Sequence, residues 1–430
     1  MNDGNSIRHE DERNMMNTDY IDLGSVDLTR PSTSNNDKNT DDDVNGDGVD
    51  GDDTSAIRLL QLTDLHIFPK TCESFKGVPL HGGYDRCLQL IDHLVTTVRP
   101  DVIVLTGDIV DGRGPWNGKG AFAEVWHDLI PRFGGTPWMY VPGNHDDDGS
   151  PWTRVDLLQI LKLPGCLQRR STGFHHTVLL RKGNNDDIHD EDNDTVTRVR
   201  LHMMDSGGND PDPKVMYECT PRKTVEGFLQ FARRRRRNNN KDDDGNDDDK
   251  KSIDTKDRDV PEIVFFHIPL PEYQHLDPVV GTNNLFEAAL AGGKIPFPLD
   301  RMAWLIRLCK LDRIAGCRRG DDDSGLFGAC ARANRMHRGR IIALFCGHDH
   351  HSDAVFWKPN ENIFLGYGRS GSTTPPFDWE GKAPNTLQPG GRVIRIDSNG
   401  NVTTWIKSLH GREEDSFLDM VSTTLGVTRM

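Results

Sequence analysis

Residues 59–68 read LLQLTDLHIF, a short apolar run that ends in a carboxylate and an imidazole. Leu59, Leu60 and Leu62 have the character of a buried strand, and Asp64 and His66 follow it directly. In an extended chain, residues two apart point to the same side, so we expect these two polar side chains to converge on one point. An isolated Asp-x-His also fits a solvated strand end, and only the rest of the chain separates the two interpretations.

The same pattern recurs at four later strand ends. Apolar runs within 101–108, 136–146, 262–273 and 340–353 each pass into a short loop containing Gly or Pro and Asp, Asn or His. In open α/β sheets, sites assemble at the carboxyl ends of the strands. The five strand ends therefore predict one shared metal site, with the candidate ligands Asp64, His66, Asp108, Asn144, His267, His348 and His350, and with His145 beside them.

Segments with helical spacing lie between several of these strands, which predicts an α/β fold. Thr220 and Pro221 are typical of a helix start, as an N-cap followed by proline. The last third of the chain contains strands without helices, which indicates a second sheet. We expect two packed mixed β-sheets flanked by helices. The expected helices lie at 85–98, 121–130, 154–161 and 298–310, and an expected strand pair lies at 174–180 and 197–205.

Low-complexity segments set the expected domain limits. Residues 1–55 are rich in Asp, Asn, Gly and Ser, and such a segment buries too little apolar surface to offset its ordering entropy, so we expect a disordered acidic tail. The remainder, 56–410, has about 300 residues once insertions are removed, enough for one large core. We place those loop-like insertions at 182–195, 233–259 and 317–339, and a C-terminal tail at 411–430.

Composition also limits the partners. The formal net charge is −15, which argues against a polyanion such as nucleic acid, and the arginine block at 233–237 is followed by an acidic run. No apolar run approaches the ~20 residues of a membrane helix, and the N-terminus is polar, so we expect a cytoplasmic protein without a membrane partner. The eight cysteines form no C-x-x-C pair, which excludes a thiolate zinc framework.

The donor types define the metals. Carboxylates, imidazoles and one amide without a thiolate suit zinc, manganese or iron. Seven donors are too many for one tetrahedral ion and suit two metal ions ~3.5–4 Å apart that share a carboxylate. Such a pair clamps a phosphoryl group and lowers the pKa of a bridging water, so that hydroxide is available as nucleophile near neutral pH.

The motifs D-L-H (64–66), G-D (107–108), G-N-H-D (143–146), F-F-H (265–267) and G-H-D-H (347–350) resemble those of the calcineurin-like metallophosphoesterases, in the same order. The resemblance extends from residue 57 to about residue 407. It implies that Asp108 bridges two metals and that His145 acts as general acid, with Asp146 orienting its ring. By the same resemblance, the first metal is bound by Asp64, His66 and His350, and the second by Asn144, His267 and His348.

A subgroup is indicated by further motifs. H-I-P-L-P-E-Y (267–273), M-D-S-G (204–207) and L-G-Y-G-R-S-G (365–371) resemble the single-domain purple-acid-phosphatase-like proteins. True purple acid phosphatases have tyrosine three residues after the bridging aspartate, whereas this chain has Asp111 there. The resemblance then implies no tyrosinate ligand and no purple ferric absorption band.

Three more residues are candidates for substrate binding. Arg113 could bind a substrate phosphate through its guanidinium fork, or form a salt bridge with Asp111 within its loop. Tyr367 and Arg369 follow a strand in a glycine-rich loop and are expected to line the mouth of the site.

Together these features favour a binuclear phosphomonoesterase that uses a metal-bridging hydroxide and His145 as general acid. The alternatives are a phosphodiesterase or nuclease on the same centre, since fold does not select substrate, and a non-catalytic scaffold. A phosphorylated small molecule or a phosphoprotein is the expected substrate.

Overall fold

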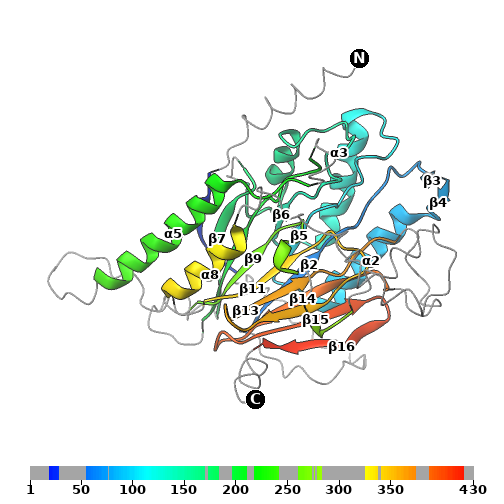
Figure 1. Cartoon of the computed structure of the whole chain (residues 1–430). Helices are drawn as coiled ribbons and strands as arrows, with labels where there is room; N and C mark the ends of the chain where they lie inside the picture. The colour runs from blue at the N-terminus through cyan, green and yellow to red at the C-terminus, as the bar shows by residue number, and fades with distance from the viewer. Residues whose placement is uncertain are drawn as a thin grey trace, which may run out of the picture.

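The computed structural model of this chain describes residues 19–28, 55–75, 77–169, 173–183, 196–210, 217–241, 260–273, 276, 278–282, 325–337, 340–373 and 387–420. In this part of the chain, two mixed β-sheets pack face to face and helices cover their outer faces (Figure 1). The predicted fold class is therefore confirmed.

The smaller sheet has the strand order β16-β15-β14-β2-β5-β6. Its central strands β2, β5 and β6 are parallel, and the remaining neighbours are antiparallel. The strands are β2 (Ile57–Leu62), β5 (Val102–Thr106), β6 (Trp138–Val141), β14 (Gly390–Ile396), β15 (Val402–Ser408) and β16 (Gly411–Asp419).

The larger sheet has the order β1-β7-β8-β9-β11-β13-β12-β10, with β8, β9, β11 and β13 parallel. Its strands are β1 (Ile21–Asp27), β7 (His176–Lys182), β8 (Thr197–Met203), β9 (Glu262–Phe265), β10 (Pro278–Val280), β11 (Ile341–Cys346), β12 (Val355–Lys358) and β13 (Ile363–Tyr367). A small hairpin joins β3 (Ser74–Phe75) to β4 (Val78–Pro79).

Helices cover both outer faces. On the smaller sheet lie α2 (Gly83–Val98) and α3 (Gly118–Leu129), and on the larger sheet lie α5 (Arg222–Lys241) and α8 (Leu326–His337) (Figure 1). The remaining elements are the 3-10 helices η1 (Ile130–Phe133), η2 (Asp156–Lys162) and η4 (Pro271–Tyr273). No helix among the described residues is long and apolar enough to cross a membrane.

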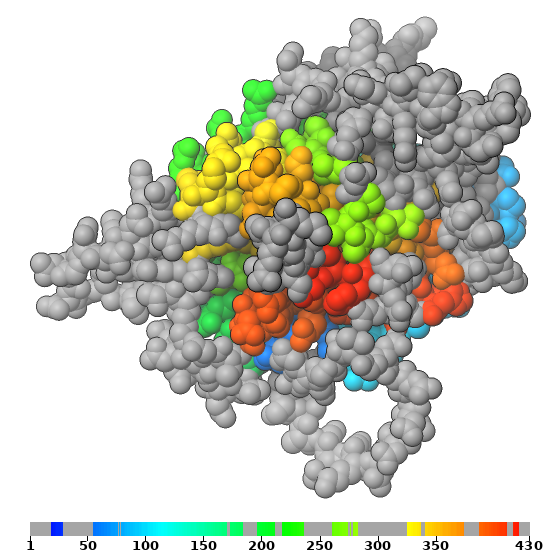
Figure 2. Space-filling model, turned by 60° about the horizontal axis from the view of Figure 1, so that its bottom comes forward, coloured from blue at the N-terminus to red at the C-terminus, as the bar shows by residue number. Residues whose placement is uncertain are grey.

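Burial on both faces explains the continuous apolar runs of the central strands. In β2, Leu59 packs in the core between the sheets, whereas Leu60 packs against the helix side. Every residue of β5 is buried. A strand covered on both faces has no solvent side and loses the alternation of polar and apolar residues. In Figure 2, the yellow-green surface that includes β10 lies beside the red surface of β16, where the two sheets approach at one edge.

The predicted tails are wrong where β1 and β16 lie, and residues 1–18, 29–54 and 421–430 lie outside the described residues. Within 1–55, β1 pairs in parallel with β7, and the Tyr20 hydroxyl lies 2.5 Å from His202 Nδ1. Within 411–430, β16 extends the smaller sheet. Composition missed both segments because an edge strand needs only one neighbouring strand and few apolar residues.

Two expected insertions also contain helix. Helix α8 lies within 317–339, and α5 continues into 233–259 as far as Lys241. Buried residues such as Cys330 and Leu326 fix α8 to the larger sheet, although charged residues surround it in the sequence. The segment predicted as a helix at 154–161 is mainly the 3-10 helix η2. Residues 298–310 and most of 182–195 lie outside the described residues, and the domain limits 56–410 stay a prediction.

His176, in β7, gives the fold a pH-dependent stability. Its ring is fully buried, and neither ring nitrogen has a hydrogen-bond partner among the described residues. Burial, together with the charges of the nearby His175 and His202, lowers the pKa of His176 to about 3. Below an unfolded-state pKa of about 6.5, the unfolded chain binds a proton that the folded chain does not, so stability falls as pH falls.

We therefore compare the free energy of unfolding of His176→Leu with that of the parent chain. The difference should favour the variant by about 2 kcal/mol more at pH 5 than at pH 7. Denaturant unfolding at both pH values measures this difference. The matched control is His127→Leu, because His127 is exposed on α3 and should show no such pH-dependent gain. An equal effect of His176→Leu at both pH values would contradict the prediction.

Candidate metal centre

The seven predicted ligands meet where the carboxyl ends of parallel strands from both sheets come together. Strands β2, β5 and β6 of the smaller sheet lead to Asp64, Asp108 and Asn144, and β9 and β11 of the larger sheet lead to the three histidines beyond position 260. The His348 amide donates to the Asp64 carboxylate, at 2.9 Å from Oδ2. This hydrogen bond joins the loops of the two sheets, so the site lies at the junction between them.

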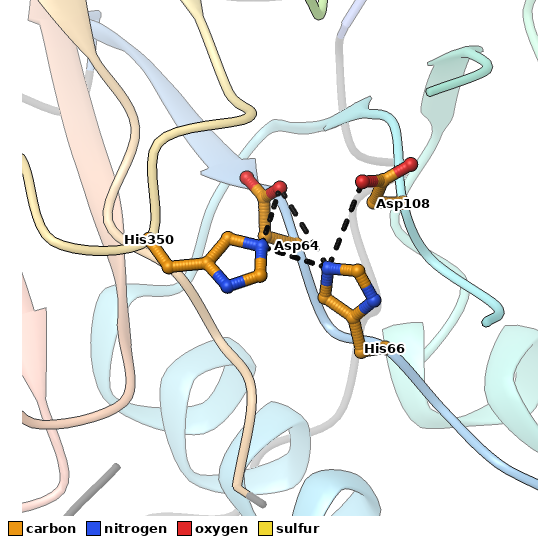
Figure 3. Close-up of side chains that lie close together, drawn as sticks. All are labelled: Asp64, His66, Asp108 and His350. Atoms are coloured by element: carbon orange, nitrogen blue, oxygen red, sulfur yellow. Dashed lines mark hydrogen bonds and ion pairs between the residues drawn. The ribbon is translucent and has the colours of Figure 1, made fainter. Parts of the chain in front are cut away.

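The first group of candidate ligands is Asp64, His66, Asp108 and His350 (Figure 3). One possible ligand atom from each lies within 4.8 Å of the others. The Nε2 atoms of His66 and His350 are 2.8 Å apart, and His350 Nε2 is 3.4 Å from Asp64 Oδ1. Two imidazole nitrogens that face each other and two carboxylates are suited to share a cation.

The second group is Asp108, His267 and His348, completed by the amide oxygen of Asn144. Asn144 Oδ1 lies 3.1 Å from His267 Nε2 and 3.0 Å from His348 Nδ1. Asp108 belongs to both groups because its Oδ2 is 3.6 Å from His66 Nε2 and 3.3 Å from His267 Nε2. One carboxylate oxygen thus lies between the two sets of ligands.

Partners outside these groups fix the orientation of the ligands. His66 Nδ1 lies 3.1 Å from Asp111 Oδ2, and His267 Nδ1 lies 2.8 Å from the Thr106 carbonyl oxygen. When each Nδ1 donates its proton to these acceptors, Nε2 is left with a lone pair for a metal. Asp111 occupies the position at which purple acid phosphatases have tyrosine. Its carboxylate contacts Nδ1 of His66, on the side of the ring away from the candidate metal site, and does not point into the site itself.

Backbone conformation places four of the ligands. Asp64, His66, Asp108 and His348 have φ values of 51°, 45°, 50° and 74°. These left-handed conformations are unfavourable for residues with a Cβ and cluster at functional sites. The prediction of an extended chain at Asp64 and His66 is therefore wrong. Their side chains converge because the chain turns sharply after β2.

The electrostatics couple the carboxylates to the histidines. Burial alone would raise the pKa of Asp108, but the charge of His267 and its hydrogen bond hold that pKa well below the usual range. Conversely, burial opposes a charge on His267, whereas Asp108 raises the pKa of His267. Protons on imidazoles therefore compensate the buried carboxylates, and metal ions would replace these protons on binding.

His145 lies beside the first group, with its ring centroid 5.6 Å from that of His66 and 21% of its side chain exposed. Its Nδ1 is 3.0 Å from Asp148 Oδ2. The predicted orienting role of Asp146 is wrong, because Asp146 is fully buried and accepts from four backbone amides. Those amides belong to Asp108, Ile109, Val110 and Gly143. The carboxylate next to the ring is instead that of Asp148, three residues after His145, because the chain turns between them.

The three predicted substrate-binding residues differ in position. Arg113 forms the alternative salt bridge, with its Nε donating to Asp111 Oδ1 at 2.8 Å, and 30% of its side chain remains exposed. Tyr367 and Arg369 do not line a mouth, because both are buried. Tyr367 packs on the Tyr273 ring, and Arg369 is paired with Asp353. Strand β13 lies inside the larger sheet, which leaves no open side for these residues.

Comparison with known proteins agrees with this geometry. The sequence profile described as calcineurin-like phosphoesterase matches residues 57–352. The match covers more than half of the chain, and the chain belongs to this family. It is therefore a metallophosphoesterase, and the family and the Asp and His side chains together indicate a pair of metal ions.

Two relatives align over most of the chain. Probable inactive purple acid phosphatase 29 of Arabidopsis thaliana is 23% identical over 80% of this chain and 77% of its own length. Phosphatase DCR2 of Saccharomyces cerevisiae is 25% identical over 85% of this chain, which spans 56% of the yeast protein. A solved dimetal phosphatase from Danio rerio aligns over 85% of this chain and 98% of its own length, with 10% identity and a TM-score of 0.47.

Gly143 provides a test of how closely the loops of the site must approach. A Cβ atom added there would overlap the carboxylate of Asp108 and lie 2.8 Å from its Cγ. We expect Gly143→Ala to displace Asp108 and weaken metal binding at least about 10-fold, measured by titration with manganese. The control is Gly120→Ala in α3, where a Cβ meets nothing within 4 Å. Equal metal affinity in the two variants would contradict the prediction.

Proposed function

We propose that this chain is a phosphomonoesterase whose two metals share Asp108. In this proposal Asp64, His66 and His350 bind the first metal, and Asn144, His267 and His348 bind the second. The observation that carries the proposal is the position of Asp108 Oδ2 between the Nε2 atoms of His66 and His267, at 3.6 and 3.3 Å. Oxygen and nitrogen donors without a thiolate fit zinc, manganese or iron.

The bound metals would neutralise phosphoryl oxygens and lower the pKa of a water so that it attacks phosphorus near neutral pH. The protein residues would perform the rest. Asp108 would bind both ions, and Asn144 would bind the second. His145 would give a proton from Nε2 to the leaving oxygen, while its Nδ1 donates to Asp148 and keeps the ring in place. Arg113, whose Nε donates to Asp111, would contact a non-bridging phosphate oxygen.

Two observations favour a monoester. A monoester carries more negative charge at the phosphoryl group than a diester, and a pair of cations together with Arg113 suits that charge. The acidic net charge of −15 also disfavours long polyanions. A phosphorylated small molecule or a phosphoprotein fits both conditions. The name of the Arabidopsis relative describes a probable inactive protein, but here all seven ligands converge, which supports activity.

A phosphodiesterase is the second candidate. Bacterial relatives named glycerophosphodiester phosphodiesterase and cyclic adenosine monophosphate phosphodiesterase each match 21% of this chain. The test is hydrolysis of p-nitrophenyl phosphate beside bis-p-nitrophenyl phosphate, by protein stripped of metal and reloaded separately with manganese, zinc and iron. We expect two metals per chain and a monoester preference. A diester preference would contradict the proposal, and two metals without activity on either would favour a scaffold.

The general-acid role of His145 predicts a dependence on the leaving group. We expect His145→Gln to lower kcat about 10²–10⁴-fold for an alkyl phosphate, with a much smaller loss for p-nitrophenyl phosphate, whose leaving group needs no proton. Metal content should stay at the parent value. Asp148→Asn should show the same selectivity with a smaller loss.

The matched control for this series is His410→Gln, which changes an exposed histidine in the turn between β15 and β16. Its kcat for both substrates should equal that of the parent chain. Equal losses for the alkyl and aryl phosphates in His145→Gln would show that His145 does not donate the proton.

A further inference from the structure

Arg154 is a largely buried arginine outside the candidate ligand set, and it connects two loops of the metal centre. Only 11% of its side chain is exposed. Its Nη1 donates to the Gly143 carbonyl oxygen at 2.7 Å and to Asp147 Oδ1 at 3.0 Å. Its Nη2 donates to the carbonyl oxygens of Pro142 at 3.2 Å and Gly207 at 2.9 Å, and the guanidinium is paired with Asp205.

The first of these loops, residues 142–148, follows β6 and carries Asn144, His145 and Asp148. At this point the chain has left the sheet, so the carbonyls of Pro142 and Gly143 have no strand partner. Buried backbone carbonyls require a donor, and Arg154 supplies one to each. The guanidinium therefore fixes the backbone directly before Asn144.

The second loop, residues 204–210, follows β8 and contacts the second ligand group. Asn209 Oδ1 accepts from Asn144 Nδ2 at 3.2 Å, which directs Asn144 Oδ1 toward His267 and His348. Ser206 Oγ accepts from the Ile268 amide at 2.9 Å, next to His267. Asp205 holds this loop to Arg154 and accepts from the Gly207 amide at 2.9 Å.

The backbone around Arg154 is anchored independently of its side chain. The Thr153 amide donates to Asp156 Oδ2 at 3.0 Å, and the Leu157 amide donates to the Thr153 carbonyl at 3.1 Å. A change at Arg154 should therefore release the two loops without unfolding η2.

We propose that Arg154 is a positioning residue for the second metal, acting through Asn144 and the loop that holds it. The inference rests on the proposed binuclear function. Arginine is required because its planar fork reaches acceptors on both loops at once, whereas the ammonium of lysine presents donors from a single atom. Loss of Arg154 would free the amide of Asn144 to rotate, and the second metal would lose its oxygen ligand.

The experiment is a calorimetric titration with Mn²⁺ of the metal-free full-length chain, carried out for the parent, Arg154→Ala and Arg154→Lys. We expect the first Mn²⁺ to bind within about threefold of the parent affinity and the second to bind about 10–100-fold more weakly in both variants. Millimolar guanidinium should restore part of the second binding step in Arg154→Ala, an effect that a general loss of stability would not produce.

Arg235→Ala is the matched control, because Arg235 is also mostly buried, with 15% of its side chain exposed, and is paired with the buried Glu262 away from the metal loops. It should lose thermal stability and keep both Mn²⁺ affinities. If Arg154→Ala fails to fold, Asp205→Asn tests the same connection and should weaken only the second step.

The outcomes separate the two proposals. A parent chain that binds fewer than two Mn²⁺ would overturn the proposed binuclear function. A parent chain that binds two, together with folded Arg154 or Asp205 variants that bind both with unchanged affinity, would overturn the role of Arg154 alone. An equal weakening of both binding steps would also overturn it, because it would indicate a structural effect on the whole site.

Discussion

The carboxylate of Asp108 is the group on which the geometry of the site depends. Its Oδ1 accepts from the His145 amide at 2.7 Å, and its Oδ2 lies between the imidazoles of His66 and His267. Burial would favour the neutral acid, yet the surrounding histidines keep it ionised. The left-handed backbone conformation of Asp108 is unfavourable. The four backbone amides that donate to the Asp146 carboxylate stabilise the same turn and compensate for it.

The layered fold explains how five distant segments reach this point. Parallel strands of both sheets end at the same edge, and the junction between the sheets brings β2 and β5 opposite β9 and β11. Close approach of the loops requires glycine. A Cβ at Gly107 would lie 2.5 Å from His267 Nδ1 and 2.6 Å from the Gly143 Cα. The strand ends therefore position the candidate metal ligands, and the contacts of Arg154 connect two of their loops.

The convergence of the candidate ligands was predictable from sequence because each lies within a few residues of the end of a buried strand, and strand ends are local features. The fold class followed from the same pattern. What failed depended on contacts distant in sequence or on turn geometry. The partner of His145 is Asp148 because the chain turns between them. Tyr367 and Arg369 are buried because of the order of the strands in the sheet, which the sequence does not reveal. Strand β1 is stabilised by pairing with β7, which is far away in the sequence. The domain limits remain a prediction.

The most direct test of a shared Asp108 is electron paramagnetic resonance of the chain loaded with two equivalents of Mn²⁺. A bridging carboxylate couples the spins of two neighbouring ions, so we predict the multiline, temperature-dependent spectrum of a coupled pair. Asp108→Asn should abolish that coupling. A spectrum of isolated Mn²⁺ ions at full loading of the unmodified chain would contradict the binuclear centre, whatever its activity.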